Sequence, residues 1–262
     1  DGVIEGLGMY TYPNKDIYKG YYRENKKNGK GILYYKDGSK YKGMWKDDVQ
    51  CGQGCITSSN EDIYEGEFEN GKLNGKGKYK FKNGDVYVGE FKDNVFHGEG
   101  CYTALNGDIY EGKYKYGLKK GKGILKLRTG EKYEGEFKDN LFEGIGRYIS
   151  KENNIYEGEF KKGKKDGIGT YICDLYKYIG EWTENEKGKI GTYFLKEGEV
   201  IEVTINDNKI IHGIYKHKNI EKYIYNVDIS GENEYIVISN IEKYLSNKSR
   251  SSITISASNI YN

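Results

Sequence analysis

The sequence predicts an all-β protein: an elongated, single-layered antiparallel sheet of stacked 23-residue β-hairpins, with a short C-terminal cap and tail. Three observations support this prediction. A Tyr-x-Gly triplet recurs every 23 residues, an aromatic residue follows each of these glycines two positions later, and a Gly-x-Gly pair lies eleven and thirteen residues after each of the first seven Tyr residues. Residues two apart on a strand share a face, so the rings and glycines of every repeat lie on one common face.

The first strand of each repeat carries the triplet and the second aromatic residue. The triplet begins at Tyr18, Tyr41, Tyr64, Tyr87, Tyr110, Tyr133 and Tyr156, and an eighth copy at Tyr178 comes one residue early. The second aromatic residue is Tyr22, Trp45, Phe68, Phe91, Tyr114, Phe137, Phe160 or Trp182. Seven copies of constant length predict that neighbouring hairpins stack into a continuous array.

The second strand carries the glycine pair, from Gly29 and Gly31 in the first full repeat to Gly167 and Gly169 in the seventh. We interpret these glycines as sites of close approach, where a ring from one strand lies over the bare backbone of its neighbour. A β-carbon at such a position would push the ring away.

Two turns join the strands. Asp37-Gly38, Asn83-Gly84 and Asn106-Gly107 precede the Tyr, and such pairs favour tight turns with positive φ. Seven residues after each Tyr the sequence has only Gly, Asn or Asp, the residues that best tolerate the left-handed region. This turn position is Asn25, Asp48, Gly71, Asn94, Gly117, Asn140, Gly163 and Asn185.

The repeat boundaries divide the chain into four parts. Residues 1–17 are a partial N-terminal repeat, and residues 18–200 are an array of eight copies whose last copy is degenerate. Residues 201–219 are expected to form a degenerate capping hairpin. Residues 220–262 are expected to form a C-terminal cap with a short helix, opened by a Ser239-x-x-Glu242 capping box, and a loose tail.

Composition excludes several classes of protein. The net charge of +2 argues against a nucleic-acid-binding surface, and no apolar segment approaches the length that a membrane-spanning helix needs. No signal-peptide pattern opens the chain, which begins with Asp rather than Met and is expected to be a piece of a longer protein. The four cysteines are expected to be free thiols in a reducing cytoplasm.

The residues also exclude a recognisable active site. The three histidines, His97, His212 and His217, have no Cys or Asp at a catalytic or metal-binding spacing, and no Gly-x-Ser-x-Gly occurs. The Gly-x-Gly pairs lack the longer phosphate-binding pattern and its following helix. We therefore predict no catalytic residue, cofactor site or metal site.

The repeat pattern resembles the MORN repeat, the membrane occupation and recognition nexus, over roughly residues 2 to 195. One departure is that the histidine often found before the first glycine of the pair occurs only at His97. The resemblance implies a non-catalytic module that acts as a scaffold at membranes and cytoskeletal structures, binds partner proteins and sometimes forms dimers. It also implies that some members are attached to a catalytic domain, such as a lipid kinase or a methyltransferase.

Two surfaces compete as binding sites. The first is the ring face, where a partner helix or extended segment would bury apolar area; the alternative is that the rings pack only on each other and on glycine. Its candidate residues are Tyr87, Phe91, Tyr102, Tyr110, Tyr133, Phe137 and Tyr148. The second is the loop edge, for a partner protein or anionic phospholipid; the alternative is that its lysines serve only solubility. Its candidate residues are Phe96, Lys119, Lys120, Phe142, Lys164 and Lys165.

The sequence thus predicts a scaffold or adaptor that docks partner proteins at membrane-associated or cytoskeletal structures in the cytoplasm. The alternative is a peripheral phospholipid-binding arm of a larger protein whose catalytic domain lies outside this chain. An open stack of strands exposes an edge, so we also expect self-association into a homodimer.

Overall fold

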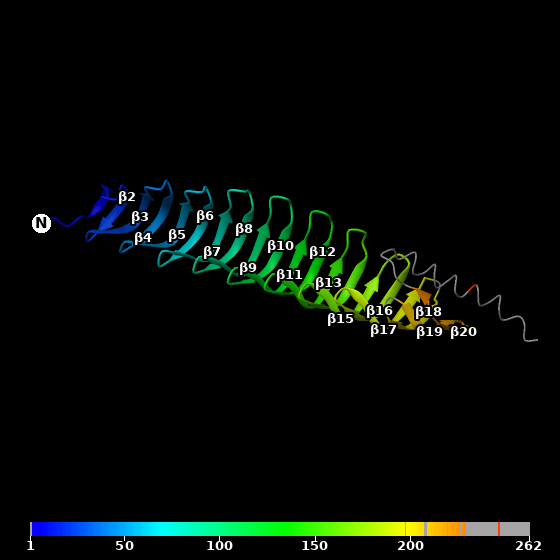
Figure 1. Cartoon of the computed structure of the whole chain (residues 1–262). Coiled ribbons are helices and arrows are strands. Elements are labelled where there is room, and N and C mark those ends of the chain that lie inside the picture. Colours follow the sequence, from blue (N-terminus) through cyan, green and yellow to red (C-terminus); the bar gives the residue numbers. More distant parts are fainter. Residues whose placement is uncertain are drawn as a thin grey trace, which may run out of the picture. The chain divides into compact units, whose positions relative to one another are not determined.

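The computed structural model describes residues 2–196, 198–206, 209–218, 220–225, 227, 228 and 246. The chain divides into two compact units, unit 1 (Asp1–Leu141) and unit 2 (Phe142–Asn262). Each unit is a single layer of antiparallel strands in which successive strands pair, except that β20 and β21 both pair with β19 (Figure 1). The predicted fold class is therefore confirmed.

Unit 1 contains twelve strands that form six successive hairpins. They are β1 (Gly6–Thr11), β2 (Ile17–Arg23), β3 (Lys26–Tyr34), β4 (Lys40–Lys46), β5 (Val49–Thr57), β6 (Ile63–Glu69), β7 (Lys72–Lys80), β8 (Val86–Lys92), β9 (Val95–Thr103), β10 (Ile109–Lys115), β11 (Leu118–Lys126) and β12 (Lys132–Lys138).

Unit 2 repeats the same arrangement, and its last strands are less regular. They are β13 (Leu141–Ile149), β14 (Ile155–Lys161), β15 (Lys164–Ile172), β16 (Tyr176–Thr183), β17 (Glu186–Leu195), β18 (Val200–Asn206), β19 (Lys209–His217), β20 (Ile220–Ile224) and β21 (Val227–Asp228). β18 and β19 pair as a hairpin, and β20 and β21 both pair with β19. The predicted short helix, from the Ser239-x-x-Glu242 capping box through Leu245, and the loose tail lie outside the described residues, apart from Ser246.

A lane of glycines crosses each sheet at one level. In unit 1 the paired positions of the register are Gly8, Gly20, Gly31, Gly43, Gly54, Gly66, Gly77, Gly89, Gly100, Gly112, Gly123 and Gly135. The Tyr of each repeat lies over this lane. A β-carbon built on Gly31, for example, would overlap the ring of Tyr18. The close-approach interpretation is confirmed for the lane glycines from Gly20 to Gly123, at each of which a β-carbon would lie under 3.0 Å from a Tyr ring or the neighbouring backbone.

The first glycine of each pair has a different role, which the sequence interpretation missed. Gly29, Gly75 and Gly121 have φ of 78°, 82° and 72°, and the strand pairing shifts register beside each of them. This is a β-bulge in which three residues of the second strand lie opposite one residue of the first, and the central glycine of the three sits in the left-handed region, where glycine carries no steric penalty. The bulge bends the second strand. The first glycine of each pair therefore allows the positive φ of the bulge, whereas the second allows the close approach of the Tyr ring.

The predicted turn position is confirmed. Asn25, Asp48, Asn94 and Asn140 have φ between 67° and 74°, and Gly71, Gly117 and Gly163 have φ of 76°, 80° and 84°. The preceding turn residue also has positive φ, as at Asp139 with 51°, so each connection is a two-residue turn of the hairpin type I′. The Asn and Asp side chains also join repeats: Asn140 Oδ1 accepts a hydrogen bond of 2.9 Å from the backbone N–H of Lys119.

Candidate functional site

The core of both sheets is a ladder of rings on one face, which we call the inner face; the opposite face is the outer face. Along unit 1 the Tyr of one repeat meets the second aromatic residue of its own repeat and of the next one edge to face. Tyr64, for example, lies 5.3 Å from Phe68 and 4.9 Å from Phe91, between ring centroids. Such edge-to-face pairs stabilise beyond the area that they bury.

The ladder is too deeply buried to contact a partner. Five of the seven candidate residues of the ring face belong to it, and their side chains are at most 3% exposed: Tyr87, Phe91, Tyr110, Tyr133 and Phe137. The remaining two, Tyr102 and Tyr148, are half-buried. A docking surface on the inner face therefore has to be formed by the side chains that cover the ladder.

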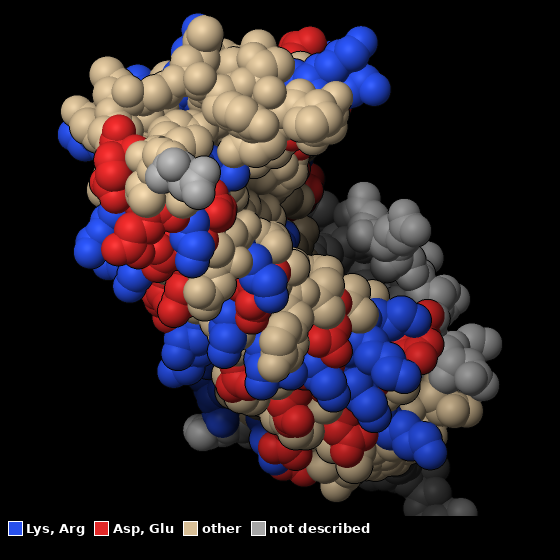
Figure 2. All heavy atoms as spheres, turned by 90° about the vertical axis from the view of Figure 1, so that its left-hand side faces the viewer, with Lys and Arg blue, Asp and Glu red and all other residues tan. Residues whose placement is uncertain are grey.

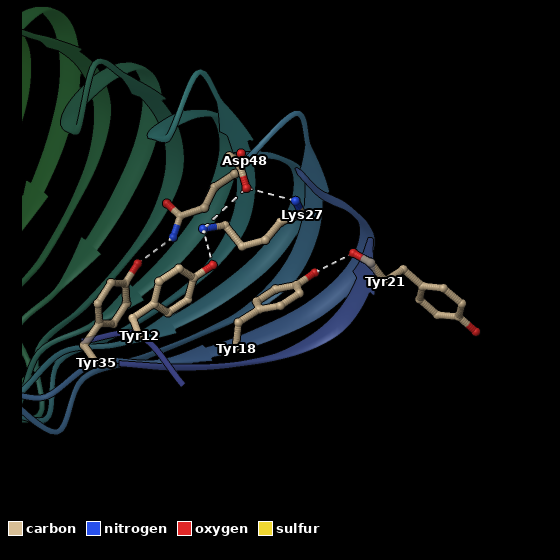
Figure 3. Close-up of polar contacts among 7 residues, drawn as sticks. Tyr12, Tyr18, Tyr21, Lys27, Tyr35 and Asp48 are labelled. Atoms are coloured by element: carbon tan, nitrogen blue, oxygen red, sulfur yellow. Dashed lines mark hydrogen bonds and ion pairs between the residues drawn. The ribbon is translucent and has the colours of Figure 1, made fainter. Parts of the chain in front are cut away.

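The side chains that cover the ladder belong to pairs of residues fifteen positions apart, one from each of two consecutive repeats, which meet across the inner face. Nζ of Lys27 lies 3.4 Å from the Tyr12 hydroxyl, Nε2 of Gln50 donates a 3.0 Å hydrogen bond to the Tyr35 hydroxyl, and the rings of Phe81 and Phe96 lie 6.3 Å apart. Figure 3 shows Tyr12, Tyr18, Lys27 and Tyr35 inside the curved sheet, with Tyr21 outside it. Because the sheet is curved, these inner-face side chains meet above the buried rings and form a second layer of side chains over them.

The most aromatic part of this second layer is a cluster of four half-buried rings over β7 to β9: Tyr79, Phe81, Phe96 and Tyr102. Phe96 stacks on the buried Tyr87 with centroids 3.8 Å apart, and Phe81 lies 4.6 Å from Tyr79 and 6.1 Å from Tyr102. The Tyr79 hydroxyl donates a 2.9 Å hydrogen bond to Asp62, and the Tyr102 hydroxyl donates one to Asp85. We call these four residues the aromatic cluster.

The expected loop edge is arranged differently from the sequence interpretation. Residues 118–120 and 164–166 lie within β11 and β15, because the connections before them have only two residues. Side chains alternate on a strand, so the candidates separate onto two faces. Phe96, Lys119, Phe142 and Lys165 are half-buried, whereas Lys120 and Lys164 are exposed. Nζ of Lys119 lies 4.7 Å from the centre of the Tyr110 ring.

Lysines on the inner face are held by rings. Nζ of Lys165 lies 5.0–5.2 Å from the centres of Tyr156, Tyr171 and Trp182, a cation–π geometry. Nζ of Lys187 lies 2.8 Å from the Tyr176 hydroxyl and 4.9–6.0 Å from the centres of four tyrosine rings. Burial lowers the pKa of Lys187 to about 8, which leaves it mainly charged at neutral pH. These lysines stabilise the inner face rather than extend from it.

The described residues contain no cluster of three His, Cys, Asp or Glu side chains that could hold a metal ion. The cysteines Cys51, Cys55, Cys101 and Cys173 are free. No helix in the described part of the chain is long and apolar enough to cross a bilayer. Figure 2 shows uncharged side chains gathered at the end of unit 1 that carries the N-terminus, and Lys, Arg, Asp and Glu intermixed elsewhere.

The sheet of stacked hairpins, with a buried ring ladder over a glycine lane, defines a β-hairpin repeat protein. The MORN repeat family matches residues 1–17, 18–40, 41–63, 64–86, 87–109, 110–132, 133–155 and 156–174. The chain therefore belongs to the MORN-repeat family, and this membership implies a scaffold or binding role.

Curated relatives match only a short part of the chain. Alsin of Homo sapiens and alsin of Rattus norvegicus are each 33% identical over 63 residues, which is 22% of this chain and 4% of alsin. The chain thus spans a small fraction of the length of these relatives.

Solved structures show a weaker likeness. A mutant of the TCP10 domain of Danio rerio CPAP matches with a TM-score of 0.38 at 9% identity, over 84% of this chain and 99% of that one. The CPAP G-box domain matches with a TM-score of 0.36 at 6% identity, over 77% and 100%. Because both TM-scores are below 0.5, we infer nothing about function from them.

Proposed function

We propose that this chain is a non-catalytic scaffold whose inner face docks a partner protein, with the aromatic cluster as its centre. The observation that carries the proposal is that four rings lie together in the outermost layer of the inner face, only half-buried and already held in place. Rings are favoured at binding hot spots because they bring large contact area at little conformational cost. The preformed hydrogen bonds of Tyr79 and Tyr102 reduce that cost further.

The cluster fits a helix or an extended segment of the partner. Its members come from β7, β9 and the connection after β7, so they lie on either side of β8, on strands about 10 Å apart. A segment laid across them would bury apolar area at roughly 25 cal/mol per Å² before ordering costs. Of the ring-face candidates in unit 1, Tyr102 is the one that remains accessible for this contact.

The experiment compares binding of an identified partner by the unchanged chain and by folded variants. Tyr102→Leu and Phe96→Ser change the cluster, and Val88→Ser is the matched control because Val88 is 51% exposed on the outer face of the same repeat. We expect the two cluster variants to weaken binding about tenfold or more and the control to leave it unchanged, measured at a temperature at which every variant is folded, since Phe96→Ser also removes the stack on Tyr87 and lowers the melting temperature. Full binding by both cluster variants would contradict the proposal.

Docking at membrane-associated or cytoskeletal structures in the cytoplasm is part of the same proposal, as is the dimer expected from an exposed sheet edge. The phospholipid alternative has less support in the geometry. Two of its four lysines, Lys119 and Lys165, rest on rings, and Lys164 pairs with Glu184 at 3.1 Å. Of these four lysines, Lys120 is the one that is exposed and has neither a ring nor an acidic side chain described beside it, as attraction to an anionic bilayer surface would require.

A further inference from the structure

The first five strands differ from the rest of unit 1 in charge. β1 to β5 contain no Asp or Glu, whereas the next strand, β6, already contains three acidic residues, Glu65, Glu67 and Glu69. Elsewhere in unit 1 acidic and basic residues face each other across strands, as Glu65 faces Lys78 and Lys76 faces Glu90. The outer face of β2 to β4 therefore has a local excess of positive charge that the nearly neutral chain does not suggest.

A shallow hollow of about 630 Å³ lies at this place on the outer face, above the glycine lane. Apolar side chains of Leu7, Ile32 and Met44 form part of its wall. The register places Lys19 opposite Ile32 and Ile32 opposite Lys42, so two lysines flank Ile32 on one side of the lane. Lys30 lies on the other side, opposite Met44.

The three lysines are available to a ligand. Lys19, Lys30 and Lys42 are exposed, and within the described part of the chain none of them forms an ion pair. Nζ of Lys19 is 5.8 Å from the centre of the exposed Tyr34 ring, which leaves its hydrogen-bond donors free for an anion. Glu65, at the far end of the hollow, is the acidic residue among those that line it.

A second hollow of about 600 Å³ follows along the same lane and provides an internal comparison. It is lined by Lys76 and Lys78 but also by Glu65, Glu90 and Glu99, so its charges are mutually compensated. The two hollows share the same backbone floor and differ in charge. The shape of the backbone floor therefore does not distinguish the two hollows. The first hollow differs in that the positive charges of its lysines are not compensated by neighbouring carboxylates.

We propose that the first hollow binds an acidic, extended segment of a partner protein that carries one apolar side chain between two carboxylates. The apolar side chain would contact Ile32 and Met44, and the carboxylates would pair with the lysines on either side. On an extended segment, residues i−2, i and i+2 point to the same face, and the two outer residues lie about 13 Å apart, a span that long lysine side chains on strands about 10 Å apart can reach. This surface lies on the face opposite to the aromatic cluster, so the inference does not depend on the inner-face proposal.

The test uses the whole chain and a dye-labelled peptide, Ser-Glu-Thr-Phe-Thr-Glu-Ser, with binding followed by fluorescence anisotropy at low salt. Two peptides serve as comparisons, one with Lys in place of both Glu and one with Ser in place of Phe. The double variant Lys19→Gln, Lys42→Gln changes the first hollow, and Lys76→Gln, Lys78→Gln is the matched control in the second. All these lysines are exposed, so unchanged melting is expected for both variants.

We expect the acidic peptide to bind more tightly than both comparison peptides, and the first double variant to weaken it about tenfold, as charge-assisted pairs at a partly exposed site would. The control is expected to stay within twofold, and Tyr102→Leu is expected to have no effect. Equal binding of the acidic and basic peptides would overturn the proposal. So would an equal loss in both double variants, or binding of anionic lipid vesicles at the hollow without binding of the peptide.

Discussion

The hydroxyl of Tyr64 donates a 2.9 Å hydrogen bond to the backbone carbonyl of Glu67, three residues along the same strand. The bond holds the ring flat against its own strand and over the glycine lane, and the Tyr64 side chain is completely buried as a result. Tyr41, Tyr87, Tyr133 and Tyr156 make the same bond to Met44, Glu90, Glu136 and Glu159. One local contact, repeated, thus sets the position of each ring in the ladder.

Replacing a lane glycine under such a ring should be strongly destabilising. A β-carbon at Gly77 would lie 2.6 Å from Cζ of Tyr64, so Gly77→Ala is expected to lower the free energy of unfolding by about 3 kcal/mol. Gly8→Ala is the matched control, because its β-carbon would meet only Tyr22, at an ordinary 3.4 Å. Urea unfolding measures both. Equal losses in the two variants would show that close approach to the ring is not the reason for the glycine.

The turn position allows a test that separates backbone strain from the hydrogen bond between repeats. Asn140 has φ of 73° and accepts the N–H of Lys119. Asn140→Gly keeps the left-handed backbone and loses only the hydrogen bond, about 1 kcal/mol. Asn140→Ala loses both, about 2–3 kcal/mol in total. Gly117→Asn, at the equivalent position of the preceding repeat, should be neutral or slightly stabilising. Thermal unfolding of the three variants checks this order, and an Asn140→Ala variant no less stable than Asn140→Gly would contradict it.

The buried tyrosines predict a steep loss of stability at alkaline pH. Burial raises the pKa of Tyr18, Tyr64 and Tyr110 to about 12, from the ordinary value of 10. The unfolded chain therefore loses its phenolic protons first as the pH rises. The stabilising contribution is complete below pH 10 and is lost between pH 10 and 12, at about 1.4 kcal/mol per pH unit for each such tyrosine.

Urea midpoints at pH 9, 10 and 11 measure this effect. Tyr64→Phe provides the control, because it removes one titrating group and should reduce the pH dependence while also losing the bond to Glu67. A midpoint that stays constant from pH 9 to pH 11 would mean that the ladder rings titrate normally in the folded chain.

Much of the fold could be predicted from the sequence because the strongest constraints are local and periodic. The left-handed turn position, seen at Asn25 and Asn140, and the close approach over Gly31 each follow from one residue type at one spacing. The bulge at Gly29 could not be distinguished in this way, since both glycines of a pair look alike in the sequence. Only the register shift beside it shows that the two have different roles.

The candidate site was harder to predict because it depends on contacts across the curved sheet. Tyr12 and Lys27, or Phe81 and Phe96, are fifteen residues apart, and nothing in a strand period of two indicates that they meet. The sequence contains only a partial signal, since an aromatic residue stands fifteen positions before the inward residue at Tyr12, Tyr35 and Phe81 but not in the other repeats. Without the curvature of the sheet, that spacing has no structural meaning, so the sequence alone leaves open whether the rings form a groove or pack only on each other and on glycine.

The last prediction concerns the membrane alternative, which the positions of the lysines make testable with matched pairs. Under that alternative, the double variant Lys120→Glu, Lys164→Glu should abolish co-sedimentation with anionic liposomes, because these two are the exposed lysines among the four of the loop edge. Lys119→Met with Lys165→Met should instead reduce stability, since both lysines rest on rings, and should leave liposome binding unchanged. Our proposal of protein docking expects no binding of the unmodified chain at about 0.1 M salt, where exposed charges more than about 10 Å apart are screened. Salt-sensitive binding that disappears only in the exposed pair would favour the phospholipid role over protein docking.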